Sequence, residues 1–124
     1  MEKEIDKGDI IKQKKFKVSP FDTTKSVYRK ARIIEPKLIY EVLTEIKNDT
    51  FQLKKQNEKF SSEYNILRKP EDSLVDENKS LKELYNFIRS CNYEEYPAFF
   101  YVKGQKVLIK LSREKKHDPY NDLI

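Results

Sequence analysis

The fold is decided by a stretch in the second half of the chain, Ser80-Leu81-Lys82-Glu83-Leu84-Tyr85-Asn86-Phe87-Ile88. Its apolar residues recur at steps of three and four, the period of a helix with one buried face: Leu81, Leu84, Tyr85 and Ile88. Ser80 with Glu83 three residues later matches a capping box, in which each side chain accepts a hydrogen bond from the other residue's backbone N–H. The sequence therefore predicts an amphipathic helix that begins after Ser80 and ends by Cys91-Asn92.

A β-hairpin is predicted directly after this helix. Residues 96–102 read Tyr-Pro-Ala-Phe-Phe-Tyr-Val and are rich in strand-forming side chains. Lys103-Gly104-Gln105 supplies a turn, and alternation from Val107 to Leu111 predicts the return strand. A hairpin of two strands is marginally stable by itself, so these residues are expected to pack against further structure.

The first half is predicted to hold one strand and one long helix. Residues 10–18 alternate weakly and read as a strand that ends at Ser19-Pro20. Asp22 is the expected N-cap of a helix that runs to Asn48-Asp49, because apolar residues recur along it at helical spacing. Pro36 lies within that pattern and removes a backbone hydrogen bond, so a kink or a junction of two helices is expected there. Together these elements predict an α+β fold.

Composition excludes several classes of function. The chain has 124 residues, of which 26 are Lys or Arg and 21 are Asp or Glu, so its net charge is +5. It contains no apolar run of about 18 residues, and its charged start is unlike a signal peptide. One cysteine, Cys91, and one histidine, His117, allow no intrachain disulfide and argue against both a Cys–His nucleophile and a metal site. No membrane association and a cytoplasmic location are therefore expected.

Three segments follow one another along the chain in a recognisable order. The first is Ile5-Asp6-Lys7-Gly8-Asp9-Ile10-Ile11, and the second is Ser19-Pro20-Phe21-Asp22-Thr23, which leads into Ser26-Val27-Tyr28. The third runs from Arg68-Lys69-Pro70-Glu71-Asp72 through residues 86–89 to residues 96–101. In order and spacing they resemble the formyltransferase family that uses 10-formyltetrahydrofolate as donor, over nearly the whole chain.

This resemblance implies that the chain is a C-terminal fragment of such an enzyme. It implies that residues 1–49 end the catalytic domain, that residues 50–67 form an extended linker, and that residues 68–124 form a C-terminal subdomain. The Rossmann-like half that binds most of the 10-formyltetrahydrofolate would precede residue 1, together with a catalytic Asn and His. The chain alone is then expected to be inactive.

The resemblance also assigns a catalytic residue. Asp6 matches the family's catalytic aspartate, which would accept a proton from the attacking amine or fix the protonation of the upstream His. Gly8 would support this loop, because glycine lets the backbone turn sharply. From residue chemistry alone, the stretch from Asp6 to Asp9 reads more readily as a solvent-exposed turn, and only the resemblance favours the catalytic role.

The acceptor is the second question that the resemblance raises. Family members acting on methionyl-tRNA carry a further basic β-barrel, for which the chain after its hairpin leaves no room. An amino sugar linked to a nucleotide is therefore the expected acceptor, and methionyl-tRNA is the alternative. Its nucleotide would be held by stacking on Tyr85 or Tyr101 and by contacts of Arg89 and Lys79 with the diphosphate. Core packing for the tyrosines, and interaction with a helix C-terminus for Arg89, remain alternatives.

Two readings from other classes also remain open. The charge of +5 with eight tyrosines and seven phenylalanines would suit a small basic nucleic-acid-binding module. The interleaving of acidic with basic residues argues against nucleic acid as a partner. The apolar face from Leu81 to Ile88 would also suit an interaction domain, and the family resemblance allows a homodimer.

Overall fold

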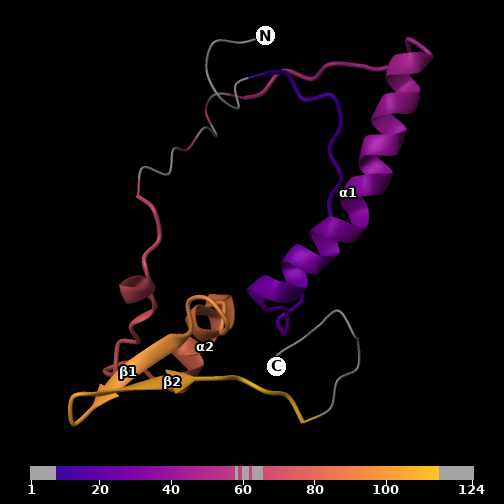
Figure 1. Ribbon diagram of the computed structural model, residues 1–124. Helices are drawn as coiled ribbons and strands as arrows, with labels where there is room; N and C mark the ends of the chain where they lie inside the picture. The colour runs from indigo at the N-terminus through magenta and orange to yellow at the C-terminus, as the bar shows by residue number, and fades with distance from the viewer. Residues whose placement is uncertain (1–7, 58, 60–61, 63–65, 115–124) are drawn as a thin grey trace. The chain divides into compact units, whose positions relative to one another are not determined.

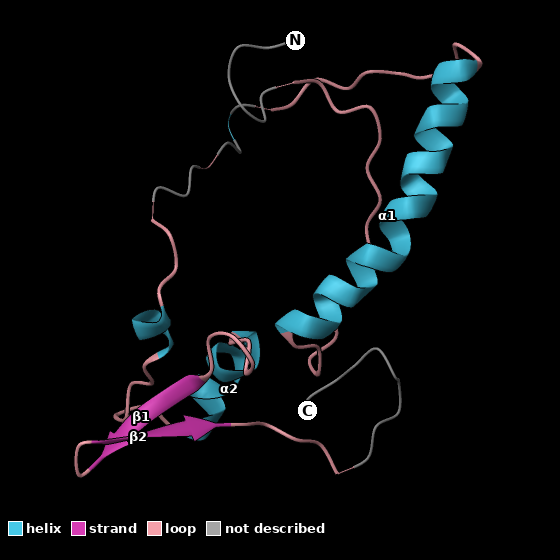
Figure 2. Cartoon of the chain, viewed as in Figure 1, coloured by secondary structure: helices cyan, strands magenta, loops and turns pink. Residues whose placement is uncertain are grey.

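The computed structural model describes residues 8–57, 59, 62 and 66–114. Their elements follow in the order α1 (Thr24–Lys47), a short 3-10 helix (Pro70–Ser73), α2 (Leu81–Ser90), β1 (Ala98–Val102) and β2 (Gln105–Ile109) (Figures 1 and 2). These elements confirm the predicted α+β class. The chain divides into two compact units, and α1 begins in one and ends in the other. The first unit takes the described residues within 1–16 and 31–65, and the second unit takes those within 17–30 and 66–124.

The core of the second unit lies between α2 and the hairpin. Half-buried Phe87, Ile109 and Leu111 pack against the buried side chains of this core. The buried side chains are those of Val75, Leu84, Ile88, Cys91 and Ala98. The capping box is confirmed, because Ser80 Oγ accepts from the backbone N–H of Glu83 and Glu83 Oε2 accepts from that of Ser80. The cap fixes the start of α2, and the helical period then directs Leu84 and Ile88 into the core.

The predicted hairpin is confirmed. β1 and β2 pair antiparallel, with Ala98 opposite Ile109 and Val102 opposite Gln105. Lys103 and Gly104 form the two-residue turn with φ of 49° and 78°, the left-handed conformation that a tight hairpin turn requires. The other edge of β1 is contacted at one point, where Leu74 and Phe99 form an isolated parallel bridge and the N–H of Val75 donates to the carbonyl of Phe99 at 2.8 Å. The two strands therefore have the third partner that a hairpin alone would lack.

The start of α1 corrects one prediction. The expected N-cap, Asp22, does not have that role; Thr23 does. Thr23 Oγ1 accepts from the N–H of Ser26 at 3.3 Å, and Ser26 Oγ accepts from the N–H of Thr23 at 2.9 Å. The threonine hydroxyl reaches the free N–H groups of the first turn because it stands directly before the first helical residue.

The helix α1 then continues without interruption through Pro36 to Lys47. Its predicted end is confirmed, because Asp49 takes a φ of 53° and the N–H of Thr50 donates to the carbonyl of Glu45 at 2.9 Å. This bond, with that from Asp49 N–H to the carbonyl of Ile46 at 3.2 Å, forms a Schellman motif.

The strand predicted for residues 10–18 is wrong. Among residues 10–18, only Ile10 makes a β-bridge, with Lys54, through two backbone hydrogen bonds of 2.8 and 2.9 Å. A strand needs a neighbour for its backbone groups, and the weak alternation of residues 11–18 gives no apolar face that would favour one. Among its described residues the first unit has no buried side chain. No helix in the described part of the chain is long and apolar enough to span a membrane.

Candidate functional site

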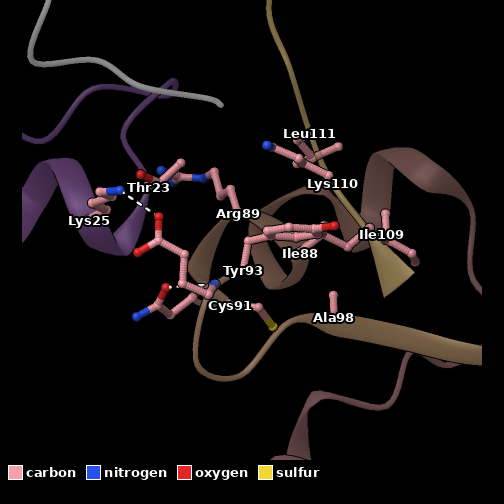
Figure 3. Close-up of a pocket in the computed structure, with 12 residues that line it drawn as sticks. Thr23, Lys25, Ile88, Arg89, Cys91, Tyr93, Ala98, Ile109, Lys110 and Leu111 are labelled. Atoms are coloured by element: carbon pink, nitrogen blue, oxygen red, sulfur yellow. Dashed lines mark hydrogen bonds and ion pairs between the residues drawn. The ribbon is translucent and has the colours of Figure 1, made fainter. Parts of the chain in front are cut away.

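A small pocket of about 70 Å³ opens in the second unit beside the C-terminal end of α2 (Figure 3). Its apolar lining comes from core residues of α2 and the hairpin: Ile88, Ala98, Ile109 and Leu111. Its polar lining comes from the start of α1, the turn after α2 and the end of the hairpin: Thr23, Lys25, Arg89, Asn92, Tyr93, Glu94 and Lys110. The pocket has an apolar floor and several polar groups at its opening, as ligand sites do, but its volume is well below the roughly 300–1,000 Å³ of a complete ligand site.

The charged groups at this opening are mostly cationic. Lys25 Nζ pairs with Glu94 Oε1 at 2.7 Å, and this hydrogen bond lowers the pKa of the Glu94 carboxyl. Lys110 Nζ lies 5.0 Å from the centre of the Tyr93 ring. With Arg89, three cations face one carboxylate among the lining residues. The opening therefore favours a negatively charged ligand group.

Two of the predicted binding residues, Tyr85 and Arg89, lie together on α2. The Arg89 guanidinium is 5.9 Å from the centre of the Tyr85 ring. Tyr85 Oη donates to the carbonyl of Pro20 at 3.1 Å, and Arg89 Nη1 donates to that of Asp22 at 2.6 Å. Arg89 Nε donates to Asn86 Oδ1 at 2.7 Å. In this structure both side chains fasten α2 to the turn before α1, and Arg89 also lines the pocket.

The turn before α1 is held by a buried carboxylate that the sequence did not single out for this purpose. Asp22 is 1% exposed, and its carboxylate accepts from the N–H of Ser19 at 2.6 Å, Ser26 Oγ at 2.8 Å and Lys30 Nζ at 2.5 Å. Burial raises the pKa of Asp22, but the hydrogen bonds from Lys30, Ser19 and Ser26 outweigh it, so the net pKa is lowered. The carboxylate therefore stays ionised and fixes the turn to which Tyr85 and Arg89 bind.

The other predicted site residues lie elsewhere. Lys79 is exposed and pairs with Asp76 at 3.8 Å, while Tyr101 is 51% exposed and meets Phe99 edge to face at 5.7 Å. Gly8 belongs to the first unit, and its carbonyl accepts from Gln56 Nε2 at 2.7 Å. Asp6 lies outside the described residues. The described residues contain no cluster of three or more His, Cys, Asp or Glu that could hold a metal ion.

Comparison with known proteins defines the class. A scan against models of known families gives no match. The chain is 33% identical over 122 residues to the bifunctional polymyxin resistance protein ArnA of Wigglesworthia glossinidia brevipalpis, covering 96% of this chain and 18% of that protein. It is 32% identical over 124 residues to the methionyl-tRNA formyltransferase of Fusobacterium nucleatum, covering 98% of this chain and 38% of that protein.

A solved structure agrees with these relatives. The crystal structure of a 4-N formyltransferase from Francisella tularensis matches with a TM-score of 0.74 and 30% identity, over 94% of this chain and 49% of that one. The chain belongs to the formyltransferase family, in which it corresponds to a C-terminal portion. It spans less than half the length of each of these three proteins.

Proposed function

We propose that the protein is an N-formyltransferase that transfers a formyl group from 10-formyltetrahydrofolate to the amine of a nucleotide-linked amino sugar. The observation that carries the proposal is the likeness to a 4-N formyltransferase at a TM-score of 0.74 over 94% of this chain. The likeness to ArnA over 96% of the chain supports it further. A 4-amino sugar is accordingly the first acceptor to test, with a 3-amino sugar second.

The donor would be bound mainly by residues outside this chain. A pocket of about 70 Å³ holds a few water molecules and is too small for a folate, so the described pocket does not fit the donor. The second unit, with its cationic opening, would instead face the acceptor. With the donor bound elsewhere, this chain alone would be inactive, as the sequence leads us to expect.

The proposed reaction is acyl transfer to nitrogen. The acceptor amine forms a bond to the formyl carbon and loses a proton, while the bond from that carbon to the donor nitrogen breaks and the donor nitrogen gains a proton. Asp6, carried over from the family pattern, would accept the amine's proton or hold the upstream His in the state that does so. Gly8 would shape the loop that presents Asp6.

Binding of the acceptor's nucleotide is proposed for the residues named from the sequence. Tyr101 presents an exposed ring on β1, and Lys79 presents an exposed ammonium group before α2, so both are accessible to a ligand. Tyr85 and Arg89 already donate to backbone carbonyls and would contribute the faces of their planar groups. Such an enzyme would act in the cytoplasm and could form a homodimer.

A second function rests on a specific observation. Relatives from Fusobacterium nucleatum and Thermotoga maritima, 32% and 31% identical, bear the name methionyl-tRNA formyltransferase. Methionyl-tRNA is therefore the alternative acceptor. Both names are those of enzymes, so they favour an enzyme over a small non-catalytic nucleic-acid-binding module.

The two acceptors can be compared in one assay. The whole protein, including any sequence upstream of this chain, would be given 10-formyltetrahydrofolate with either a nucleotide-linked 4-amino sugar or methionyl-tRNA, and the formylated product measured. We expect turnover with the sugar. Turnover with methionyl-tRNA only would establish the alternative, and turnover with neither would reject both.

The role of Asp6 is tested in the same assay. Asp6→Asn should lower kcat by about 100-fold or more, the usual contribution of a positioned proton acceptor, while Asp9→Asn should leave it near the wild-type value. A wild-type rate for Asp6→Asn would remove Asp6 from the mechanism.

A further inference from the structure

Arg113 follows the hairpin and lies against an aromatic ring. Its guanidinium carbon is 4.7 Å from the centre of the Phe21 ring, in the turn before α1. Residues 111–114 have no regular secondary structure and alternate between half-buried and exposed side chains, with Leu111 and Arg113 half-buried. A cation over an aromatic face is attracted by the ring's electrons, so Phe21 holds the guanidinium in place.

Two nitrogens of this guanidinium lack an acceptor. Nε and Nη2 of Arg113 are buried, and no hydrogen-bond partner for either atom lies among the described residues. These two atoms lie on the same edge of the planar group and point in parallel, so together they can bind two oxygens of one carboxylate or phosphate. A buried donor without an acceptor is costly, so an anionic partner at this edge would be stabilising.

The surroundings favour phosphate over an isolated carboxylate. The pocket described above is lined by Leu111, two residues before Arg113, and by Thr23, two residues after Phe21. Lys25, Arg89 and Lys110 stand at the same pocket with only Glu94 as counter-charge. Several cations around one small opening suit a diphosphate, which carries more than one negative charge.

We propose that Arg113, supported by Phe21, binds the diphosphate group of a nucleotide-linked ligand near this pocket, whose lining includes Leu111 and Thr23 but not Arg113 itself. The identity of the ligand as a nucleotide-linked sugar rests on the proposed function. The binding of a phosphate anion by the Nε–Nη2 edge rests on the geometry alone. Arg113 would be a binding residue beyond Lys79, Tyr85, Arg89 and Tyr101.

Calorimetric titration of the intact protein tests this proposal with three probes. Inorganic pyrophosphate and uridine diphosphate should each bind saturably, and uridine without phosphate should bind at least tenfold more weakly than uridine diphosphate. Equal binding of uridine and uridine diphosphate would contradict the proposal, as would the absence of saturable binding by both phosphates. Binding of pyrophosphate but not of uridine diphosphate would retain the anion site and reject a uridine nucleotide as its ligand.

Matched variants locate the site. Arg113→Gln should weaken pyrophosphate binding about tenfold or more, and Arg113→Lys should also weaken it because lysine keeps the charge but loses the planar fork. Phe21→Leu should weaken it about threefold through loss of the ring. Lys82→Gln, which removes an exposed charge on α2, should change the Kd by less than twofold. Equal effects of Arg113→Gln and Lys82→Gln would overturn the proposal.

A thermal melt distinguishes an external ligand from a partner within the protein. Without ligand, Arg113→Gln should change Tm by no more than about 3 °C, because it removes donors that have no acceptor. A larger fall in Tm would mean that Arg113 is paired with a carboxylate of the protein itself and would overturn the proposal. None of these measurements requires formyl transfer, so failure of the proposed function would leave their result unchanged.

Discussion

At the scale of single residues, the second unit depends on a buried ion pair. Asp22 is 1% exposed and receives three hydrogen bonds, one of them from the partly buried ammonium group of Lys30. Its backbone carbonyl in turn accepts from Arg89, which belongs to a distant part of the chain. One residue therefore joins the turn before α1 both to the first turns of that helix and to α2.

Replacing Asp22 by Asn should destabilise the protein by about 2–4 kcal/mol at pH 7, because Lys30 loses its charged partner and an amide N–H₂ replaces an acceptor. The folded-state pKa of Asp22 lies below its unfolded value. The contribution of the ionised Asp22 carboxylate to the free energy of unfolding is therefore fully present above the unfolded pKa of about 3.9. It is lost as pH falls through the folded pKa. Urea unfolding at pH 7 and pH 3 measures both effects, and the difference between Asp22→Asn and wild type should shrink at pH 3. Glu95→Gln, which changes an exposed carboxylate, is the control. If Asp22→Asn lowered the free energy of unfolding no more than Glu95→Gln does, the stabilising role of the Asp22–Lys30 pair would be contradicted.

At the scale of elements, the sequence predicts those that depend on local signals and does not predict those that depend on contacts between distant residues. The helix α2 and the hairpin were predictable because a capping box, a helical period and a turn glycine each act within a few residues. The strand at residues 10–18 was not, because a strand depends on a neighbour that no local pattern identifies. The pocket was only partly predictable: Arg89 was named, but its bond to Asp22, 67 residues away, follows from packing.

The hairpin turn gives an element-scale prediction. Gly104 has a φ of 78°, which residues with a Cβ adopt only with strain, although a Cβ at this position would meet no atom within 4 Å beyond the adjoining residues. Gly104→Ala should therefore lower the free energy of unfolding by about 1–2 kcal/mol through backbone strain alone. Gly8 also has free space around a built Cβ but does not have a left-handed φ, so Gly8→Ala should change stability by less than about 0.5 kcal/mol. Chemical denaturation of the two variants tests the difference, and equal effects would show that φ is not the cause.

At the scale of the whole molecule, the two units differ in how they are stabilised. The second unit buries a cluster of apolar side chains around α2 and the hairpin. The first unit has no buried side chain among its described residues, and apolar residues of α1 within it are well exposed, with Ile39 at 53% and Leu43 at 60%. Its described side-chain contacts include ion pairs of Lys12 with Glu41 and Glu45, and of Lys14 with Glu41.

This difference predicts unequal protection from hydrogen exchange in the 124-residue chain. Exposed ion pairs contribute little to stability and are screened by salt, whereas buried apolar area stabilises α2. Amides of residues 38–47 in α1 should therefore exchange at least about tenfold faster than those of residues 84–90 in α2, and 0.5 M sodium chloride should increase the rate only for the former. Exchange followed by mass spectrometry at two protein concentrations tests this. Equal protection at both concentrations would contradict the prediction, and protection of residues 38–47 that rises with concentration would show that a second copy of the chain covers the apolar side chains of α1.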